Sequence, residues 1–418
     1  MSKLWVLMFT AFVDMVGALM IIPLLPFYAK HLGANGFELM VIVASFSAAQ
    51  LLSAPLWGRV SDRYGRRPAL IAGLTAAVIS YVIFAYANTL WLLLLSRLVQ
   101  GAGGGTTGVV QAYVTDSVAP RNRARGLGWL SAATNLGVML GPVLGSVTTL
   151  LGTHAPGLIA ATLGALNIMF VWFFLTESHG LAARTISGAR RSIGTAVFRV
   201  LRHPRDVPSQ LIWMYATAIG ANYGIGSLLT LFLNDRFHVT EQTIGFYFVY
   251  IGGLNVLFRL GLLGRVVDRL GEARTTRLGA VVLAAGLALI PLTYPLGLPG
   301  PFSLLLLALA TALLPLGQTL TFPSITALLS QVVQDDERGL YLGVQQTYGG
   351  VSRVVYPPLA GLAWDDLGIP FPFWISAILV ATTLLIGRGL TAYAQHDEAA
   401  VEQAAEQGVS KEGAVVGE

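Results

Sequence analysis

The chain has 418 residues, of which 55% are hydrophobic and only 11% are charged, and its formal net charge is +5. Soluble domains carry roughly 25% charged residues, so this composition excludes a water-soluble protein and predicts an integral membrane protein. Cysteine is absent, which excludes disulfides, a thiolate nucleophile and a cysteine-based metal site.

Twelve segments are apolar and long enough to cross a bilayer, which takes about 20 residues of helix. We therefore expect an all-α membrane protein with twelve transmembrane helices. The predicted spans are 4–28, 38–57, 68–87, 90–113, 125–151, 156–176, 208–233, 241–263, 275–294, 302–329, 338–363 and 370–393.

Lysine and arginine are distributed unevenly between the predicted loops. Loops after odd-numbered spans hold Lys30 and Arg236, whereas loops after even-numbered spans are rich in arginine. Short cytoplasmic loops carry an excess of Lys and Arg, so the loops after even-numbered spans and both termini are expected in the cytoplasm. We expect the protein in the cell (inner) membrane. This bias accounts for the net positive charge, which gives no indication of a nucleic-acid partner.

An eight-residue motif occurs twice. "GRVSDRYG" at 58–65 recurs as "GRVVDRLG" at 264–271, with six of eight positions identical at an offset of 206. Each copy follows the second span of its half, so we expect two pseudo-symmetric six-helix bundles with a binding site between them. The expected units are an N-terminal bundle 1–176, a cytoplasmic linker 177–207, a C-terminal bundle 208–394 and a disordered cytoplasmic tail 395–418.

The linker contains a helical pattern. In "RRSIGTAVFRVLRHP", the residues Ile193, Ala196, Val197, Val200 and Leu201 share one face of a helix, and the arginines fall mostly elsewhere. This pattern favours a helix lying on the membrane surface. A solvated linker with chance periodicity is the alternative.

Four motifs resemble those of the major facilitator superfamily, and within it the drug:proton antiporters that include tetracycline and multidrug exporters. These motifs are "GRVSDRYGRRP" after span 2, "RLVQGAGGG" in span 4, "GVMLGPVLGS" in span 5 and "FVDMVGALMIIPLLP" in span 1. The resemblance covers nearly the whole chain and implies alternating access, no cofactor and a monomer.

The motif after span 2 implies a conformational latch. In the family, Asp62 would bind across the interface between the halves and steady the outward-facing state, with Asp116 as a partner in the charge network. The alternative is that these charges only set the topology. The latch residues that we expect are Gly58, Asp62, Arg63, Gly65, Arg66 and Asp116, with Asp268 and Arg269 from the second copy.

Span 5 carries a stripe of small residues. Gly137, Gly141 and Gly145 recur every four residues, which permits close backbone packing, and Pro142 bends the helix. The resemblance implies that this packing resists leakage between the halves. Ser146 stands where a second glycine is commoner.

Asp14 is the one acid deep in a predicted span. It lies ten residues after Leu4, about 15 Å into the membrane at 1.5 Å per residue. All six histidines fall in loops or near span ends, so Asp14 is the candidate proton carrier at the midplane. Lone intramembrane charges are unfavourable, and family geometry makes Arg97 the expected partner. A permanent Asp14–Arg97 ion pair with a purely structural role is the alternative.

The resemblance implies a pathway lined by spans 1, 4, 7 and 10, and polar residues of span 11 are further candidates. Each polar residue in these spans could contact the substrate, or it could instead form a hydrogen bond between two helices. The candidate cavity residues are Asp14, Arg97, Gln100, Asn222, Tyr223, Gln318, Gln345, Gln346 and Arg353.

These features predict a secondary transporter that exports amphiphilic, drug-like compounds in exchange for protons. The spans contain several arginines but only one deep acid, so the net charge inside the membrane is positive. This charge suits an anionic or zwitterionic amphiphile. The alternative transporter exports a sugar or a lipid-like anion, with or without coupling to protons. An enzyme is disfavoured because the chain lacks a nucleophile or metal cluster with its base. A non-transporting receptor would tolerate replacement of Asp14.

Overall fold

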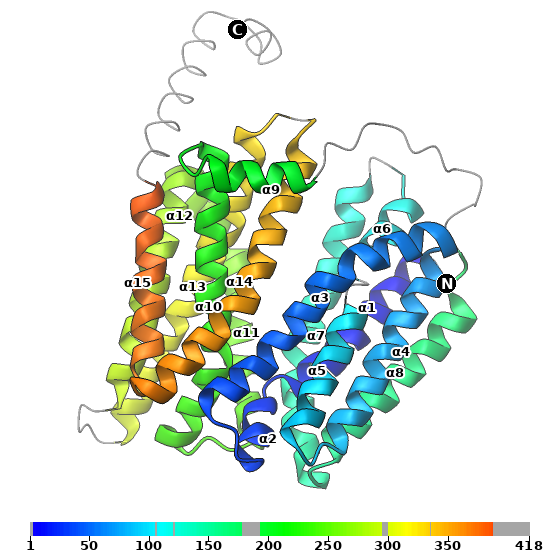
Figure 1. The fold of residues 1–418 in the computed structure, drawn as a ribbon, viewed down its shortest axis with the longest axis horizontal. Helices are drawn as coiled ribbons and strands as arrows, with labels where there is room; N and C mark the ends of the chain where they lie inside the picture. Colours follow the sequence, from blue (N-terminus) through cyan, green and yellow to red (C-terminus); the bar gives the residue numbers. More distant parts are fainter. Residues whose placement is uncertain are drawn as a thin grey trace, which may run out of the picture.

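The computed structural model describes residues 3–104, 107–119, 122–177, 193–294, 300–334 and 336–387. Within these ranges the secondary structure is helical throughout. Figure 1 shows the helices standing side by side in two groups, with the first half of the chain in one group and the second half in the other. The all-α fold with two bundles is therefore confirmed.

The described residues of the first half form eight α-helices. Pro23 follows α1 and lacks the N–H that would continue the helix, so the first predicted span is built from two helices. The predicted fourth span corresponds to α5 and α6. The helices are α1 (Lys3–Ile21), α2 (Leu25–His31), α3 (Gly36–Tyr64), α4 (Arg66–Ala85), α5 (Leu90–Gly104), α6 (Thr107–Ser117), α7 (Arg123–Thr148) and α8 (Ala155–Phe174).

The second half contains seven α-helices. Short 3-10 turns, Thr149–Leu151 and Ile290–Thr293, extend α7 and α12. The helices are α9 (Ile193–Arg202), α10 (Val207–Phe237), α11 (Ile244–Gly261), α12 (Leu263–Leu289), α13 (Gly300–Val332), α14 (Arg338–Asp366) and α15 (Phe371–Ile386).

Nine helical segments of the described chain are long and apolar enough to cross a membrane. The other predicted spans correspond to α5 with α6, to α14 and to the shorter apolar helix α15. The nine segments are Leu4–His31, Gly36–Tyr64, Arg66–Ala85, Arg125–Leu151, Ala155–Phe174, Val207–Phe237, Ile244–Gly261, Leu263–Thr293 and Pro301–Val332.

The repeated motif is helical in both copies, where a loop was predicted. α3 continues to Tyr64, and a single residue, Gly65, separates it from α4. The second copy lies inside α12, which kinks at Gly271. Gly65 (φ 104°) and Gly271 (φ 70°) both adopt a positive φ that glycine accommodates without strain, so the repeat extends to the backbone conformation.

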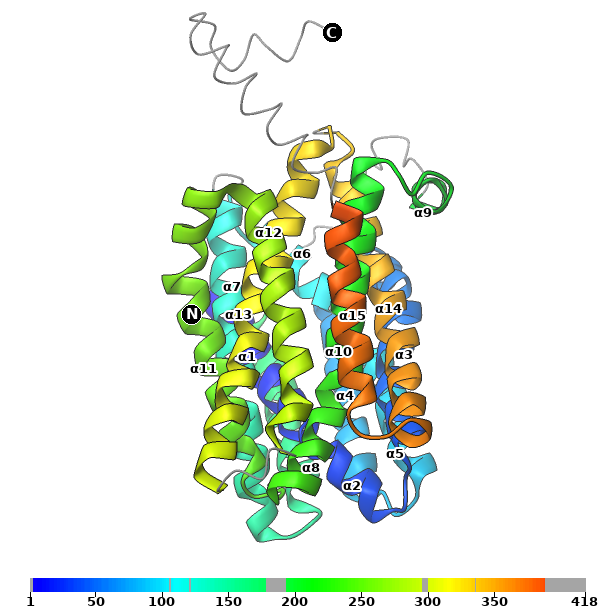
Figure 2. The same ribbon diagram turned by 90° about the vertical axis from the view of Figure 1, so that its left-hand side faces the viewer.

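Helix packing repeats in the same way. The α1–α7, α4–α5, α4–α8 and α3–α5 contacts correspond to α10–α14, α12–α13, α12–α15 and α11–α13 in the second half. Between the halves, α3 packs on α14 and α7 packs on α11, which are again equivalent pairs. Figure 2 shows α3 and α14 as neighbours along their length.

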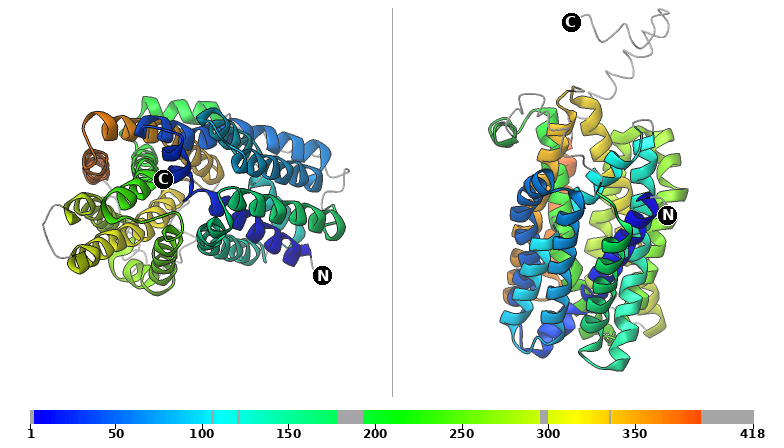
Figure 3. Two further views of the ribbon diagram at one scale, coloured as in Figure 1. Left: turned by 90° about the horizontal axis from the view of Figure 1, so that it is seen from below. Right: turned by 90° about the vertical axis from the view of Figure 1, so that its right-hand side faces the viewer.

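The two ends of the bundles differ in charge. We call the end that carries the repeated motif the arginine-rich end, and the end that carries 33–35, 149–154 and 238–243 the arginine-poor end. Viewed along the helices from the arginine-poor end, α2 lies at the junction between the bundles (Figure 3).

The linker helix α9 lies across the arginine-rich ends of the second-half helices (Figure 1). Its residues Ala196 and Val200 pack into the second-half core, and Tyr348 donates a hydrogen bond to the carbonyl of Val197 at 3.0 Å. Part of the predicted apolar face therefore packs on protein, and contact of this helix with the membrane stays a prediction. Phe198 and Leu201 are the exposed apolar residues of this helix.

Candidate functional site

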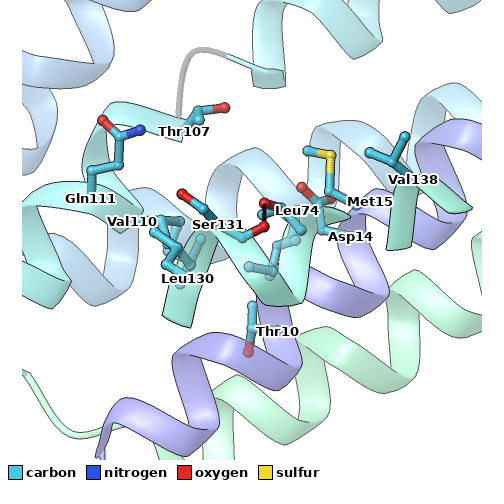
Figure 4. Close-up of a pocket in the computed structure, with 13 residues that line it drawn as sticks. Thr10, Asp14, Met15, Leu74, Thr107, Val110, Gln111, Leu130, Ser131 and Val138 are labelled. Carbon is cyan, nitrogen blue, oxygen red and sulfur yellow. Dashed lines mark hydrogen bonds between the residues drawn. The ribbon is translucent and has the colours of Figure 1, made fainter. Parts of the chain in front are cut away.

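Asp14 lies where two cavities of the first bundle meet. The larger cavity, of about 270 Å³, lies between α1, α4, α6 and α7 and is surrounded by apolar and hydroxyl side chains (Figure 4). The carboxylate is its one charged group. Its lining residues are Thr10, Ala11, Asp14, Met15, Leu70, Leu74, Thr107, Val110, Gln111, Leu130, Ser131, Thr134 and Val138.

The smaller cavity, of about 60 Å³, continues from Asp14 towards α3, α4 and α5. Gln50, Tyr81 and Gln100 provide its polar lining. Gln100 is only 4% exposed, and its Oε1 has no hydrogen-bond partner. A buried polar atom without a partner is costly, and a water occupies about 30 Å³, so this cavity suits one or two waters.

Arg97 lies apart from Asp14. It is 2% exposed, its Nε is 3.4 Å from Ser96 Oγ, and its guanidinium lies over the Phe84 ring at 5.6 Å. No ion pair with Asp14 forms between these two described residues, so the expected pair is absent from this conformation. Gln100, one turn further along α5, is the residue that reaches the cavity beside Asp14.

Tyr81 is the residue between these charged groups. Its side chain lines the smaller cavity together with Asp14 and Gln100. Its ring packs against α1 so closely that a Cβ on Gly17 would lie 3.2 Å from it. Aromatic residues in apolar spans give no sequence signal of a polar role, which is why Tyr81 was not among the predicted residues.

The predicted cavity residues of the second bundle pair with one another. Gln318 donates to Asn222 at 2.7 Å, and the guanidinium of Arg353 lies over the Tyr223 ring at 5.3 Å. Of the nine predicted cavity residues, the structure brings only Asp14 and Gln100 together around these two cavities.

Two neighbouring glutamines of α14 have different surroundings. Gln345 is fully buried and faces Thr326 Oγ1 at 3.4 Å, whereas Gln346 donates to the Tyr215 hydroxyl at 3.3 Å. Both contacts lie within the second bundle. Neither glutamine lines the cavities beside Asp14.

Several lining residues were missed by sequence reasoning although a pattern was present. Thr10 precedes Asp14 by one helical turn, and Thr107 precedes Gln111 by the same spacing, so each pair shares a helix face. Ser131 and Thr134 on α7 complete the polar lining.

The arginine-rich end holds a charge network centred on Arg66. Its Nη1 is 3.0 Å from Asp62 and its Nε is 3.2 Å from Asp116, so one guanidinium joins the ends of α3 and α6. Glu177 accepts hydrogen bonds from the amides of Arg66 and Arg67, at 2.9 and 3.1 Å, and so caps α4.

Other members of the expected latch lie outside that network. Gly58 has open space around it, and Arg63 lies over the Tyr64 ring at 5.4 Å. In the second copy Asp268 and Arg269 are exposed. The position of Arg66 is taken there by Glu272, which accepts a hydrogen bond from Gln331 at 3.2 Å.

The glycine stripe of α7 packs on α1. A Cβ on Gly137 would lie 2.7 Å from Met15 Cβ, and one on Gly141 would lie 2.7 Å from Leu19 Cβ. The glycines therefore hold α7 inside its own bundle. The contact to the other bundle is made beside them, where Ser146 Oγ accepts a hydrogen bond from the amide of Gly245 at 2.9 Å.

The carbonyl of Pro142 lies next to the same contact. A Cβ on Gly245 of α11 would be 2.7 Å from that oxygen. The residue that departs from the family pattern, Ser146, thus forms a hydrogen bond between the halves. Among the described residues, no group of three His, Asp or Glu side chains converges.

Two pseudo-symmetric helical bundles with a half-buried carboxylate in an internal cavity define a secondary transporter architecture. The family model of the Major Facilitator Superfamily matches residues 7–299 and 261–414. The chain belongs to the Major Facilitator Superfamily.

Its curated relatives include two groups of resistance proteins. It is 29% identical over 383 residues to "Tetracycline resistance protein, class C" of Escherichia coli, covering 87% of this chain and 93% of that protein. It is 26% identical over 398 residues to "Multidrug resistance protein 2" of Bacillus subtilis (strain 168), covering 92% and 93%.

Solved structures share the fold. The nucleoside transporter NupG superposes with a TM-score of 0.75 at 15% identity, over 94% of this chain and 99% of that one. The human organic anion transporter MFSD10 superposes with a TM-score of 0.63 at 22% identity, over 93% and 99%.

Proposed function

We propose that the protein exports amphiphilic, drug-like organic compounds from the cytoplasm in exchange for protons, and that Asp14 carries the proton. The observation that carries this proposal is the position of Asp14, whose carboxylate is shared by a 270 Å³ cavity and a smaller polar one. A substrate in the larger cavity and a proton on the carboxylate then affect each other directly. The names of the tetracycline and multidrug resistance relatives support export.

The cavity also favours one class of substrate. Arg97 and Arg353 are stacked over Phe84 and Tyr223, and neither lines the cavities around Asp14. The charged group that a ligand would meet in these cavities is the Asp14 carboxylate. The rest of the lining is apolar with a few hydroxyl and amide groups, and such a lining suits a drug-like ligand. We therefore propose a compound with a positively charged or neutral polar group and an apolar body.

A second candidate is an exporter of anionic or lipid-like compounds, with or without coupling to protons. Buried nitrogen atoms of two arginines favour it, because Arg97 Nη2 and Arg353 Nε have no hydrogen-bond partner. An anionic ligand could supply the acceptor that each of these nitrogens lacks.

The proposed setting is the inner membrane, with the arginine-rich end in the cytoplasm. Arginines of the loop segments gather at that end, as they do in cytoplasmic loops. Both termini would then be cytoplasmic. We propose a monomer that requires the bilayer, a small molecule and protons, and that performs no enzymatic reaction.

The test uses proteoliposomes with a pH dye inside and an outward gradient of each compound from a panel. The panel holds cationic, zwitterionic and anionic amphiphiles, and the proteins are wild type, Asp14→Asn and the exposed control Asp366→Asn. We expect cations to drive proton uptake with wild type and the control but not with Asp14→Asn. Transport of anions alone would replace the first proposal by the second, and unchanged proton flux in Asp14→Asn would remove Asp14 from coupling.

A further inference from the structure

The arginine-poor end is where polar contacts recorded between the two bundles gather. Lys30 and His31 of α2 reach the second bundle, and Ser146 and Asp365 add hydrogen bonds from α7 and α14. The contacts are Lys30 with Asn234 (2.7 Å) and Asp235 (2.5 Å), His31 with Glu241 (3.3 Å), Ser146 with Gly245 (2.9 Å), and Asp365 with the amides of Gly36 and Phe37. This end is closed in the structure.

The first amides of α3 show how the closure works. Asn35 and Glu38 form a capping box, in which each side chain accepts the other's backbone N–H. The amides of Gly36 and Phe37 remain, and a helix cannot satisfy them itself. The carboxylate of Asp365 accepts both, at 2.8 Å through Oδ1 and 2.7 Å through Oδ2.

Asp365 belongs to the other bundle, so this cap joins the halves. Its negative charge lies at the positive end of the α3 dipole, where a carboxylate is stabilising. Two oxygens on two adjacent amides fix the direction of approach as well as the distance. A cap made by a distant segment exists only while the two bundles are together.

Glycines at the same place bring the backbones close enough for this cap. A Cβ on Gly36 would lie 2.7 Å from Asp365 Oδ1, and a Cβ on Gly361 would lie 2.6 Å from the Gly36 carbonyl. The neighbour of Gly361 is backbone, so a larger residue at Gly361 separates α3 from α14, whereas a larger residue at Gly36 displaces the Asp365 carboxylate. The backbone approach at Gly361 is independent of the charge and points to the same contact.

We propose that Asp365 is a latch that holds the arginine-poor end closed and must release α3 in each transport cycle. α3 and α14 run antiparallel, so each helix brings an acid near its C-terminus to the end where the other helix begins. Asp365 does this at the arginine-poor end, as the family resemblance expects of Asp62 at the opposite end. The transporter would then have one such latch for each closed state.

The test measures the opening of this end directly. Because the chain has no cysteine, pairs of cysteines can be introduced and spin-labelled without background. Leu151 in the first bundle and Leu292 in the second are exposed at the arginine-poor end. The distance distribution between labels at these positions is measured by pulsed electron paramagnetic resonance in lipid nanodiscs.

In Asp365→Ala we expect the open population to rise relative to the closed one by about 2-fold to 30-fold, the range for losing a helix cap. Asp366→Ala removes the same charge from the next residue, which makes none of these contacts, and should leave the distribution unchanged. Gly361→Ala keeps the carboxylate and should open the same end by steric separation of the two backbones.

Two outcomes overturn the proposal. One is an unchanged distribution in Asp365→Ala, and the other is an equal shift in Asp366→Ala. If Asp365→Ala does not fold, Asp365→Asn, which keeps one acceptor oxygen, is measured instead and should give a smaller shift in the same direction. The measurement needs neither substrate nor proton gradient, so it can fail while the proposed export function stands.

Discussion

Replacing Gly141 by alanine should separate α7 from α1. The new Cβ would lie 2.7 Å from Leu19 Cβ and 2.8 Å from the Val16 carbonyl oxygen. Favourable carbon–carbon contact begins at about 3.5 Å, so the helices must move apart by roughly 0.8 Å, which is 3.5 minus 2.7. Overpacking of this kind costs about 1–3 kcal/mol, and no lipid-facing rotation relieves it because the stripe faces protein.

The assay is thermal unfolding of the purified protein in detergent, followed by tryptophan fluorescence. The matched control is Gly128→Ala on the same helix, where a Cβ has nothing within 4 Å. We expect Gly141→Ala to unfold several degrees below wild type and Gly128→Ala to unfold at or above it. Equal unfolding temperatures for the two variants would refute the packing argument.

Two further predictions concern the charged contacts at the opposite ends. Arg66→Lys loses the fork that joins Asp62 to Asp116, so transport should slow several-fold while unfolding changes by less than about 1 kcal/mol; an unchanged transport rate would contradict this. Burial raises the pKa of Glu241 above its usual 4.5, against the opposing effect of His31. The folded state therefore favours the protonated carboxyl, and its contribution to stability is full below about pH 4.5 and lost as pH rises through the raised pKa. Relative to Glu241→Gln, wild type should lose unfolding temperature between pH 4.5 and 7, and a wild type that gains unfolding temperature relative to the variant over that range would contradict the sign.

The helical spans were predictable because the membrane imposes an apolar run of fixed length on each one. The repeat was predictable for a different reason, since Gly65 and Gly271 hold the same backbone conformation in both halves. Boundaries at the motif were wrong because helix propensity continues to Tyr64, beyond the apolar run.

Side-chain pairing was much less predictable. Asp14 and Arg97 were expected to pair because each is a charged residue deep in its span. The orientation of α5 instead places Arg97 over Phe84 and leaves Gln100 beside Asp14. The α9 pattern has the same limit, because an amphipathic face indicates which residues are buried and not whether protein or lipid buries them. Ala196 and Val200 pack on the second-half core, whereas Leu201 of the same predicted face is exposed.

The central claim is that substrate and proton share Asp14. The most direct measurement is proton release when a permanent cation, tetraphenylphosphonium, binds the purified protein in weakly buffered solution between pH 5 and 8. The account predicts that wild type releases up to one proton per bound cation and that Asp14→Asn releases none. Equal release by both proteins, or binding to wild type without release at any pH in that range, would contradict the account.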